Sequence, residues 1–274
     1  MDWRAFFVHL LVPKLVLKAQ MLAFVVFTAS LLGHRPDWSG ILGFLLFFIT
    51  YLSTYFYNDV VDAEDDRKKA VYPAKLLARG RATEREYIFL AVNLFAAGTL
   101  LATLYSPLLG AVSFLAVFLN NVRSHVRKIL PRQLLLVAVE YLNFAAAWVS
   151  LYDGMPGPLA SAVLLEYGIL YALGHVVYKA RRPTGLALRR ADSSVLAVLS
   201  VLFALPALYV LFRHWAGPLF GVGGALLYVL PQQVRVSRGD LNDQSFVDRI
   251  YWQHTALMGL VGLWFLVGAL IILS

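Results

Sequence analysis

The sequence predicts an all-α, polytopic membrane protein. Of its 274 residues 60% are hydrophobic and only 15% are charged, and the mean hydropathy is +0.69, which is more apolar than a soluble domain with one core. Apolar runs of roughly 15 to 22 residues alternate with polar loops, a length typical of transmembrane helices, whereas a barrel would show short alternating segments. We therefore expect nine transmembrane helices around a central cavity, in a single membrane domain over residues 1–274.

The N-terminal segment differs from the spans that follow it. Residues 1–12 mix aromatic and basic side chains, which is typical of a helix that lies in the membrane interface before Pro13. The first span begins after Pro13 and carries Lys14 and Lys18 one turn apart. These two lysines either extend their ammonium groups to the interface or line a polar cavity. The other eight spans are expected at about 38 to the acidic segment near 58, 87–104, 107–120, 134–151, 159–178, 194–212, 217–230 and 254–273.

The pattern of loops indicates a weak internal repeat. Two halves of four helices each, at about 13–120 and 134–230, both have a large basic loop after their second helix, and a ninth helix follows at about 250–273. We expect a paired site between the two halves, beneath these loops.

The basic residues predict the orientation in the membrane. Of the 24 Lys and Arg residues, 22 fall in residues 1–18 or in the loops that precede odd-numbered spans, and only Arg35 and Arg213 fall in the others. By the positive-inside rule, the N-terminus and the acidic segment face the cytoplasm and the C-terminus lies outside. Because the basic residues lie beside membrane spans, lipid phosphates explain the net charge of +8 better than nucleic acid, and we expect no nucleic-acid partner.

The chain contains no cysteine, which limits its chemistry. A disulfide framework, a thiolate nucleophile and a cysteine metal site are all excluded. Any metal ion must therefore be bound by oxygen or histidine.

The strongest candidate site is the acidic segment that ends the second span. On a helix, Asp59, Asp62 and Asp66 fall within about 60° of one another, so three carboxylates share one face. An oxygen-only cluster of this kind favours Mg²⁺ over a transition metal. A solvated acidic helix end is the alternative.

The same helix face continues into the membrane through Tyr55 and Tyr51. The carboxylates therefore lie at the end of an apolar wall, which favours a binding site, and both tyrosines are candidate cavity residues.

The corresponding helix end in the second half is basic. Tyr171, His175, Lys179 and Arg182 share a helix face, and Arg181 lies beside them. Lys179, Arg181 and Arg182 either bind phosphate directly or are ordinary positive-inside residues.

Further polar residues lie in or beside the spans of the second half. Arg127 and Lys128 meet either a substrate phosphate or lipid headgroups. Glu140 and Asn143 lie one turn apart inside the fifth span, where an intramembrane carboxylate is a candidate for function or a satisfied packing partner.

The residues Asn58, Asp59, Asp62 and Asp66 fit the pattern Asn-Asp-x-x-Asp-x-x-x-Asp. This pattern and its place at the end of the second of nine helices resemble the UbiA superfamily of intramembrane prenyltransferases. The segment 73–83 is similar to that family's Pro-x-Arg-Pro-Leu-x-x-Gly-x-Ile-Ser, with Lys75 where Arg is usual and Arg79 beside the glycine. The second aspartate-rich motif of the family is absent, since residues 174–182 contain no carboxylate.

The resemblance implies a chemistry. Mg²⁺ bound by the aspartates would clamp a polyprenyl diphosphate and promote its ionisation, and a small-molecule or lipid acceptor would attack the allylic cation. Lys75 and Arg79, in the segment that resembles the family, are expected to bind the diphosphate.

Alternative functions remain open because the second half departs from the family. Relatives with a basic second half transfer phosphoribose onto a polyprenyl phosphate, and a non-catalytic scaffold or lipid-binding subunit is a further hypothesis. A secondary transporter has less support because no broken helix is evident. The sequence does not define the acceptor, the prenyl chain length or the oligomeric state.

Overall fold

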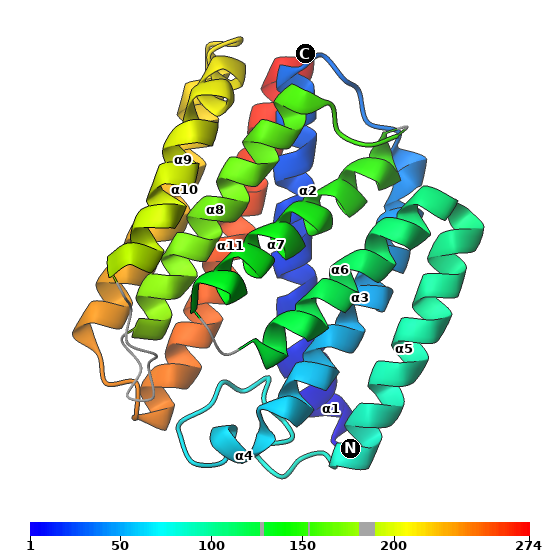
Figure 1. Cartoon of the computed structure of the whole chain (residues 1–274), viewed down its shortest axis with the longest axis vertical. Coiled ribbons are helices and arrows are strands. Elements are labelled where there is room, and N and C mark those ends of the chain that lie inside the picture. Colours follow the sequence, from blue (N-terminus) through cyan, green and yellow to red (C-terminus); the bar gives the residue numbers. More distant parts are fainter. Residues whose placement is uncertain (127–128, 153, 181–189) are drawn as a thin grey trace.

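The computed structural model describes residues 1–126, 129–152, 154–180 and 190–274; the side chains of 129–130, 174–180, 190–194 and 228–238 are not described. The described residues are helical or in turns and loops, with no strand among them, so the all-α prediction is confirmed. Long helices run along the molecule, with the C-terminus at one end and the N-terminus and α4 at the other (Figure 1). The elements in chain order are α1 (Trp3–Ala5), η1 (Phe6–Leu11), α2 (Val12–Leu31), η2 (Trp38–Gly40), α3 (Ile41–Val61), α4 (Ala63–Asp66), α5 (Glu84–Tyr105), α6 (Pro107–His125), α7 (Ile129–Leu151), α8 (Pro158–Ala180), α9 (Arg190–Leu211), α10 (Ala216–Arg238) and α11 (Gln244–Leu273).

Six helices in the described part of the chain are long and apolar enough to cross a membrane. They lie at Trp3–Leu31, Trp38–Val61, Glu84–Tyr105, Pro107–His125, Pro131–Leu151 and Gln244–Leu273. The described apolar portions of the other three long helices are shorter, at Pro158–Leu173, Val195–Leu211 and Ala216–Leu227. The chain is therefore an integral membrane protein, and the expected count of nine spans stays a prediction.

The N-terminal segment is part of the first long helix. The helical elements α1, η1 and α2 follow one another without a break from Trp3 to Leu31, through Pro13. Residues Ala5, Phe6 and Leu10 are buried against α3 and the following loop, in a cluster with Phe56. The expectation of a separate interfacial helix before Pro13 is therefore wrong, because this segment continues into α2 and is partly buried against the rest of the protein.

Two helices, α11 and α5, begin earlier than predicted because polar capping residues stabilise their first turns. The helix α11 begins at Gln244, not near 254, because Asp243 caps it by accepting a hydrogen bond from the Ser245 N–H at 2.9 Å. The helix α5 begins at Glu84, because Thr83 and Glu86 form a reciprocal capping box. Hydropathy alone does not detect these polar first turns.

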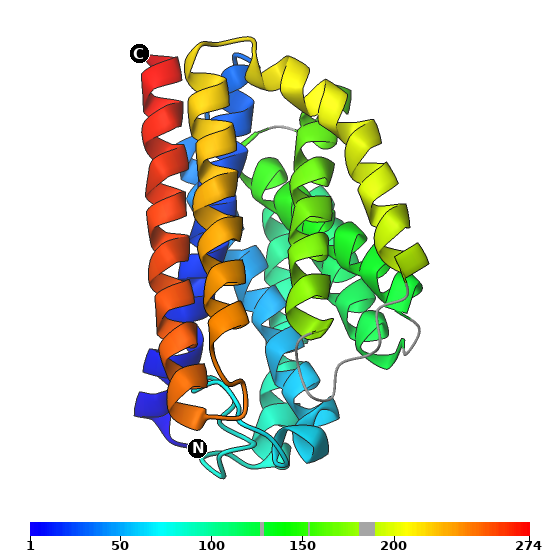
Figure 2. The same cartoon turned by 90° about the vertical axis from the view of Figure 1, so that its left-hand side faces the viewer.

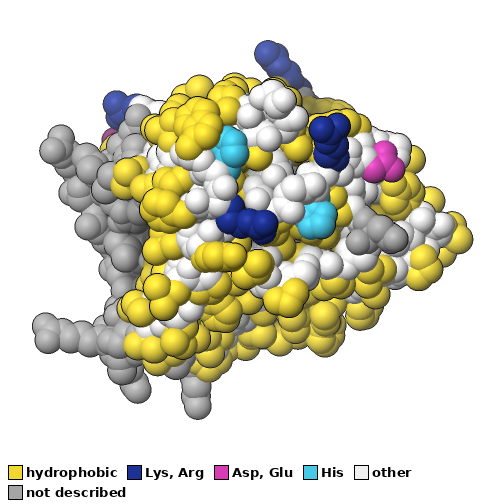
Figure 3. Space-filling view, turned by 90° about the horizontal axis from the view of Figure 1, so that it is seen from above, with side chains coloured by type: hydrophobic (Ala, Val, Ile, Leu, Met, Phe, Trp, Pro, Cys, Tyr) yellow, Lys and Arg dark blue, Asp and Glu magenta, His cyan; other side chains and the backbone are white. Residues whose placement is uncertain are grey.

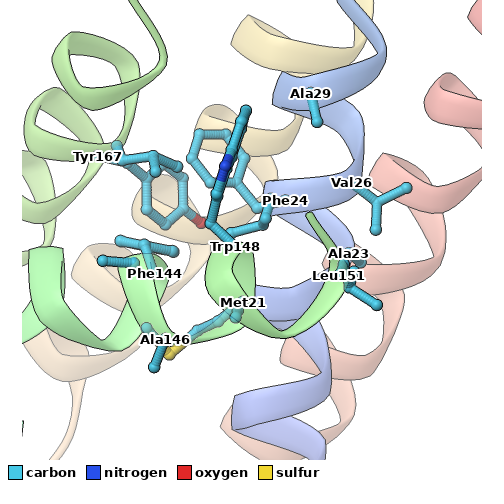
Figure 4. Packing of buried hydrophobic residues seen from close by; sticks show 14 of the residues in the cluster. Met21, Ala23, Phe24, Val26, Ala29, Phe144, Ala146, Trp148, Leu151 and Tyr167 are labelled. Carbon is cyan, nitrogen blue, oxygen red and sulfur yellow. The ribbon is translucent and has the colours of Figure 1, made fainter. Parts of the chain in front are cut away.

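The main core lies between α2, α3, α7, α8 and α11. Phe24 stacks on Tyr167 with ring centroids 4.2 Å apart and meets Phe144 edge to face at 5.6 Å. Figure 4 shows these rings together, with Trp148 and Met21 packed beside them. Figure 2 shows α10, α11 and α2 side by side, and α11 packs along α2. This packing fixes the position of α2, whose inner face lines the cavities described below.

The two ends of the molecule differ in charge. The end that carries the C-terminus shows mostly hydrophobic and uncharged side chains, with few charged ones among the described residues (Figure 3). The opposite end carries α4 and the basic loop after it. This asymmetry agrees with the predicted charge bias, while the orientation in the membrane stays a prediction.

Candidate functional site

The site is built around the carboxylates at the end of α3. The helix ends at Val61, and Asp62 is its C-cap residue, followed by the single turn α4. The Asp66 N–H still donates to the Asp62 carbonyl oxygen at 2.9 Å, so helical spacing continues through the break. Asp59 and Asp66 are therefore buried on a common face, with 7% and 5% of each residue exposed.

The Lys75 side chain lies between these two carboxylates. Its ammonium donates a hydrogen bond to Asp59 Oδ1 and lies 3.1 Å from Asp66 Oδ2. Asp66 is also paired with Lys69 through its other oxygen at 2.8 Å. The carboxylate face predicted from helical spacing is thus closed by a cation from the following loop.

The loop that carries Lys75 is anchored by apolar residues. Leu76 and Leu77, directly after Lys75, are buried in the cluster that includes Phe56 and Tyr87. Gly80 has a φ of 67°, a left-handed conformation that favours glycine and turns the chain back towards α5. The position of Lys75 follows from this anchoring, which explains why a polar residue between apolar neighbours reaches a buried site.

The charges of this ion pair support one another. Burial alone would raise the pKa of Asp66, but Lys75 and Lys69 outweigh it and hold that pKa below its usual value. Burial would likewise lower the pKa of Lys75, but Asp59 and Asp66 raise it above its usual value. Both groups are therefore charged at neutral pH.

A cavity of about 270 Å³ opens beside this ion pair, and we call it the acidic-end cavity. The part of its lining that we call the acidic wall consists of Asn58, Asp59 and Asp62 at the end of α3. The lining also includes four cationic side chains, Lys14, Lys75, Arg123 and Arg132. A cavity lined by both acidic and basic groups can hold a cation and a polyanion together.

The acidic wall fits a hard metal ion. The buried Asn58 Oδ1 has no hydrogen-bond partner among the described residues, so an oxygen ligand is available there. Together with Asp59 and Asp62 it forms the all-oxygen donor set that Mg²⁺ prefers. In the described part of the chain no three carboxylate or histidine side chains converge in a ligand cluster, and Lys75 neutralises Asp59 and Asp66 instead. The donor set therefore fits a hard divalent ion, with the Lys75 ammonium beside it as a cation tethered to Asp59 and Asp66.

A second cavity of about 140 Å³, which we call the interior chamber, continues from the first. The two cavities share Lys14, Tyr55, Asn58 and Arg123 in their walls. The chamber lies between α2, α3, α6, α7 and α8. The site therefore extends from the acidic end of α3 into the core of the helix bundle.

Four of the predicted cavity residues line the interior chamber: Tyr51, Tyr55, Glu140 and Tyr171. Asn143 lies behind the wall, 1% exposed, and donates a hydrogen bond to Glu140 at 3.2 Å. Lys14 and Lys18, for which two interpretations were open, both line the chamber. Of the two interpretations, the structure therefore favours a polar cavity for both lysines over extension to the membrane interface.

The predicted phosphate-binding residues are only partly described. Arg79 does not line either cavity; it pairs with Asp248 at 2.5 Å and donates to the Val71 carbonyl oxygen at 3.1 Å. Arg127, Lys128, Arg181 and Arg182 lie outside the described residues, as do the side chains of His175 and Lys179. Arg123 and Arg132 line the acidic-end cavity. They were not among the predicted phosphate-binding residues, because helical spacing alone did not place them near α3.

Other polar residues have local structural contacts. Glu166 in α8 accepts a hydrogen bond from the Ser200 hydroxyl at 2.6 Å and does not line either cavity. Asp240 accepts from the Asn242 N–H, and Asp243 caps α11. Each of these carboxylates thus has a local hydrogen-bond donor, although the second oxygen of Glu166, Oε2, is buried without a partner among the described residues.

The fold and the cavities define an all-helical integral membrane protein with a charged site at one end of the bundle that extends into its core. Among solved structures, the chain is similar to a UbiA homolog from Archaeoglobus fulgidus bound to GPP and Mg²⁺, with 15% identity, a TM-score of 0.55, and coverage of 93% of this chain and 99% of that chain. The structure of a UbiA homolog from the same organism bound to DMAPP and Mg²⁺ is also similar, with 17% identity, a TM-score of 0.54, and coverage of 96% and 99%. No protein-family model matches the sequence, and neither does any curated protein. The chain therefore has the UbiA fold, which agrees with the resemblance in the sequence.

Proposed function

We infer that the chain is a Mg²⁺-dependent intramembrane transferase that moves a polyprenyl group from its diphosphate to a small-molecule or lipid acceptor. The observation that carries this proposal is the acidic-end cavity, whose lining combines Asn58, Asp59 and Asp62 with Lys75 and Arg123. The UbiA homologs with the same fold were solved with GPP or DMAPP and Mg²⁺. A diphosphate and a metal ion are the ligands that such a combination of charges would take.

The residues of the acidic-end cavity would assist the departure of the diphosphate in two ways. Asn58, Asp59 and Asp62 would hold Mg²⁺, which when bound neutralises charge on the diphosphate oxygens. Lys75, Arg123 and Arg132 would bind the same oxygens directly and stabilise the charge that develops as the C1–O bond breaks and its electron pair passes to the leaving diphosphate. The acceptor would then attack the allylic cation, and its proton would be lost. No protein nucleophile is needed.

A second candidate function follows from the excess of cations. Four cationic side chains, Lys14, Lys75, Arg123 and Arg132, line the acidic-end cavity. They also suit transfer of phosphoribose onto a polyprenyl phosphate, where a lipid phosphate and a sugar phosphate must be bound at once. A membrane assay with labelled phosphoribosyl diphosphate tests this candidate, and the absence of a labelled lipid product argues against it.

The test of the main proposal is turnover by the purified full chain in detergent or nanodiscs. Isoprenoid diphosphates of several lengths are combined with several acceptors and Mg²⁺, and products are read by mass spectrometry. Asp62→Ala should abolish product formation, whereas Asp65→Ala, a change at a neighbouring exposed acidic residue outside both cavities, should not. Full activity of Asp62→Ala would show that the metal assignment is wrong. Diphosphate binding without any product would instead favour the non-catalytic alternative.

A further inference from the structure

The helix α5 uses one face for its contacts with the rest of the described chain. It lies at the edge of the molecule (Figure 1) and packs mainly against α3 and α6. Its buried residues recur at intervals of four and seven, on one side of the helix: Tyr87, Ala91, Gly98 and Ala102. A Cβ added at Gly98 would lie 2.6 Å from Thr50 Oγ1 on α3, so this side is closely packed. The other side of α5, which we call its outer face, is open to the surrounding membrane.

The outer face is apolar except for one amide side chain. Phe89 and Leu100 on this face are 66% and 60% exposed, as expected for side chains in contact with lipid. Asn93 is also exposed, and on a helix Asn93, Ala96 and Leu100 fall within about 60° of one another. Asn93 lies nine positions after Glu84 in a helix of 22 residues, or about 14 Å along it. Its amide is therefore near the middle of a hydrocarbon layer about 30 Å thick.

The hydrogen-bonding capacity of this amide is only partly used. The Asn93 Nδ2 donates one hydrogen bond, to the Phe89 carbonyl oxygen at 2.7 Å. Its second N–H and its Oδ1 have no partner among the described residues. Lipid chains offer neither a donor nor an acceptor, so an unpaired amide costs free energy at this depth. The partner that is missing must both accept and donate a hydrogen bond.

A second copy of the same chain supplies such a partner. All copies insert into the membrane in the same direction, so a two-fold axis along the membrane normal brings the outer face of α5 against itself. The two Asn93 side chains then meet at the same depth, and each can donate its free N–H to the Oδ1 of the other. Ala96, on the next turn, is small and exposed, which lets the two helix backbones approach closely. The amide is thus self-complementary across the axis.

We propose that the outer face of α5 is a homodimer interface, in which two copies pack about this axis and pair their Asn93 amides. The proposal goes beyond the transferase function and requires no assumption about its substrates. No residue of α5 lines the acidic-end cavity or the interior chamber. Each copy would therefore keep its own complete site, and the interface lies against the back of α5, away from the side that contacts α3.

The first test is cross-linking in native membranes, where all copies share one orientation. Because the chain has no cysteine, a single introduced cysteine reports contact between copies. Ala96→Cys, treated with copper phenanthroline, should give a disulfide-linked dimer of twice the mass of the chain. Val201→Cys is the matched control, at a 68% exposed position of α9, and should remain mostly monomeric.

The second test measures the contribution of the amide itself. Dimerisation is followed by energy transfer between labelled full-length copies in lipid vesicles as the ratio of protein to lipid is varied. Asn93→Leu should weaken dimerisation by about 10- to 300-fold, the combined worth of two hydrogen bonds between membrane helices. Asn93→Gln keeps the amide and should retain most of the dimer. Leucine suits a lipid-facing position, so Asn93→Leu should fold, and its thermal unfolding checks this directly.

The outcomes separate this proposal from the proposed function. Cross-linking at Ala96→Cys no stronger than at Val201→Cys would overturn it, and so would an Asn93→Leu dimer as stable as that of the wild type. A cross-linked product with a mass other than that of two chains would also overturn it, because the partner would then be a different protein. An Asn93-dependent dimer of a chain that transfers no prenyl group would support the interface while the transferase proposal failed.

Discussion

The ammonium of Lys75 and the carboxylate of Asp59 form a buried hydrogen-bonded ion pair across the break between α3 and the loop after α4. The pair joins two features that are sixteen positions apart in the chain. It lies at the edge of the cavity that we assign to a metal ion and a diphosphate.

Lys75→Met should destabilise the protein and make its stability depend on Mg²⁺. Removing one partner of a buried pair leaves Asp59 without its counter-ion and Asp66 with Lys69 alone, at a cost of about 3–5 kcal/mol. Mg²⁺ could then take the position of the lost ammonium, so added Mg²⁺ should raise the thermal unfolding temperature of the variant more than that of the wild-type protein. Lys75→Arg, which keeps the charge, is the control. An equal Mg²⁺ response in wild type and Lys75→Met would contradict the role of Lys75 as a tethered cation.

The same ion pair predicts how stability varies with pH. Since the pKa of Asp66 is lowered in the folded protein, its contribution is present above the unfolded pKa of about 4 and is lost as the pH falls through the folded pKa. Since the pKa of Lys75 is raised, its contribution is present below the unfolded pKa of about 10.4 and is lost as the pH rises through the folded value. Unfolding temperatures measured across pH should therefore show a plateau between about pH 4 and pH 10. Asp66→Asn should remove part of the decline on the acid side, and an unchanged acid limb would contradict the assignment.

The acidic face could be predicted from the sequence only in part. The spacing of Asp59 and Asp66 was sufficient to predict a common face, because the Asp66 N–H still bonds to the Asp62 carbonyl oxygen beyond the end of α3. The cation that closes this face comes from Lys75, whose position depends on the burial of Leu76 and Leu77 in a tertiary cluster. No local pattern contains that information.

The lysines of α2 also show that sequence spacing does not decide the surroundings of a side chain. Spacing placed Lys14 and Lys18 one turn apart near the start of a span, where both extension to the interface and a polar cavity are physically reasonable. The packing of α2 against α11 and α7, which leaves the interior chamber beside the two lysines, is a property of the folded bundle. The early start of α11 was missed for a related reason, since its first turns are polar and are held by contacts with a distant loop.

Tyr251→Phe should destabilise the contact between η1 and α11. Pro13 has no N–H and cannot donate to the His9 carbonyl oxygen four positions earlier, and the Tyr251 hydroxyl donates to that oxygen at 2.7 Å. Loss of this hydroxyl leaves the partly buried carbonyl unsatisfied, at about 1–3 kcal/mol. Thermal unfolding of the purified protein measures the effect. Tyr209→Phe, at an exposed tyrosine of α9, is the control, and equal unfolding temperatures for the two variants would contradict this account of Pro13.

Gln244→Ala should release the loop that carries Lys75. The Gln244 side-chain amide donates to the Val71 carbonyl oxygen at 2.6 Å and accepts from the Val71 N–H at 3.1 Å, so it pairs with the loop backbone as a neighbouring strand would. With this pairing lost, the Arg79–Asp248 ion pair and the contact between the Tyr72 and Tyr251 rings still link this part of the loop to α11. Hydrogen exchange by mass spectrometry should show faster exchange over residues 67–83 in the variant, by about five- to 150-fold if each of the two lost hydrogen bonds contributes about 0.5–1.5 kcal/mol. Gln253→Ala, farther along the same helix, should leave this exchange unchanged. If both variants exchange alike, Gln244 does not hold the loop.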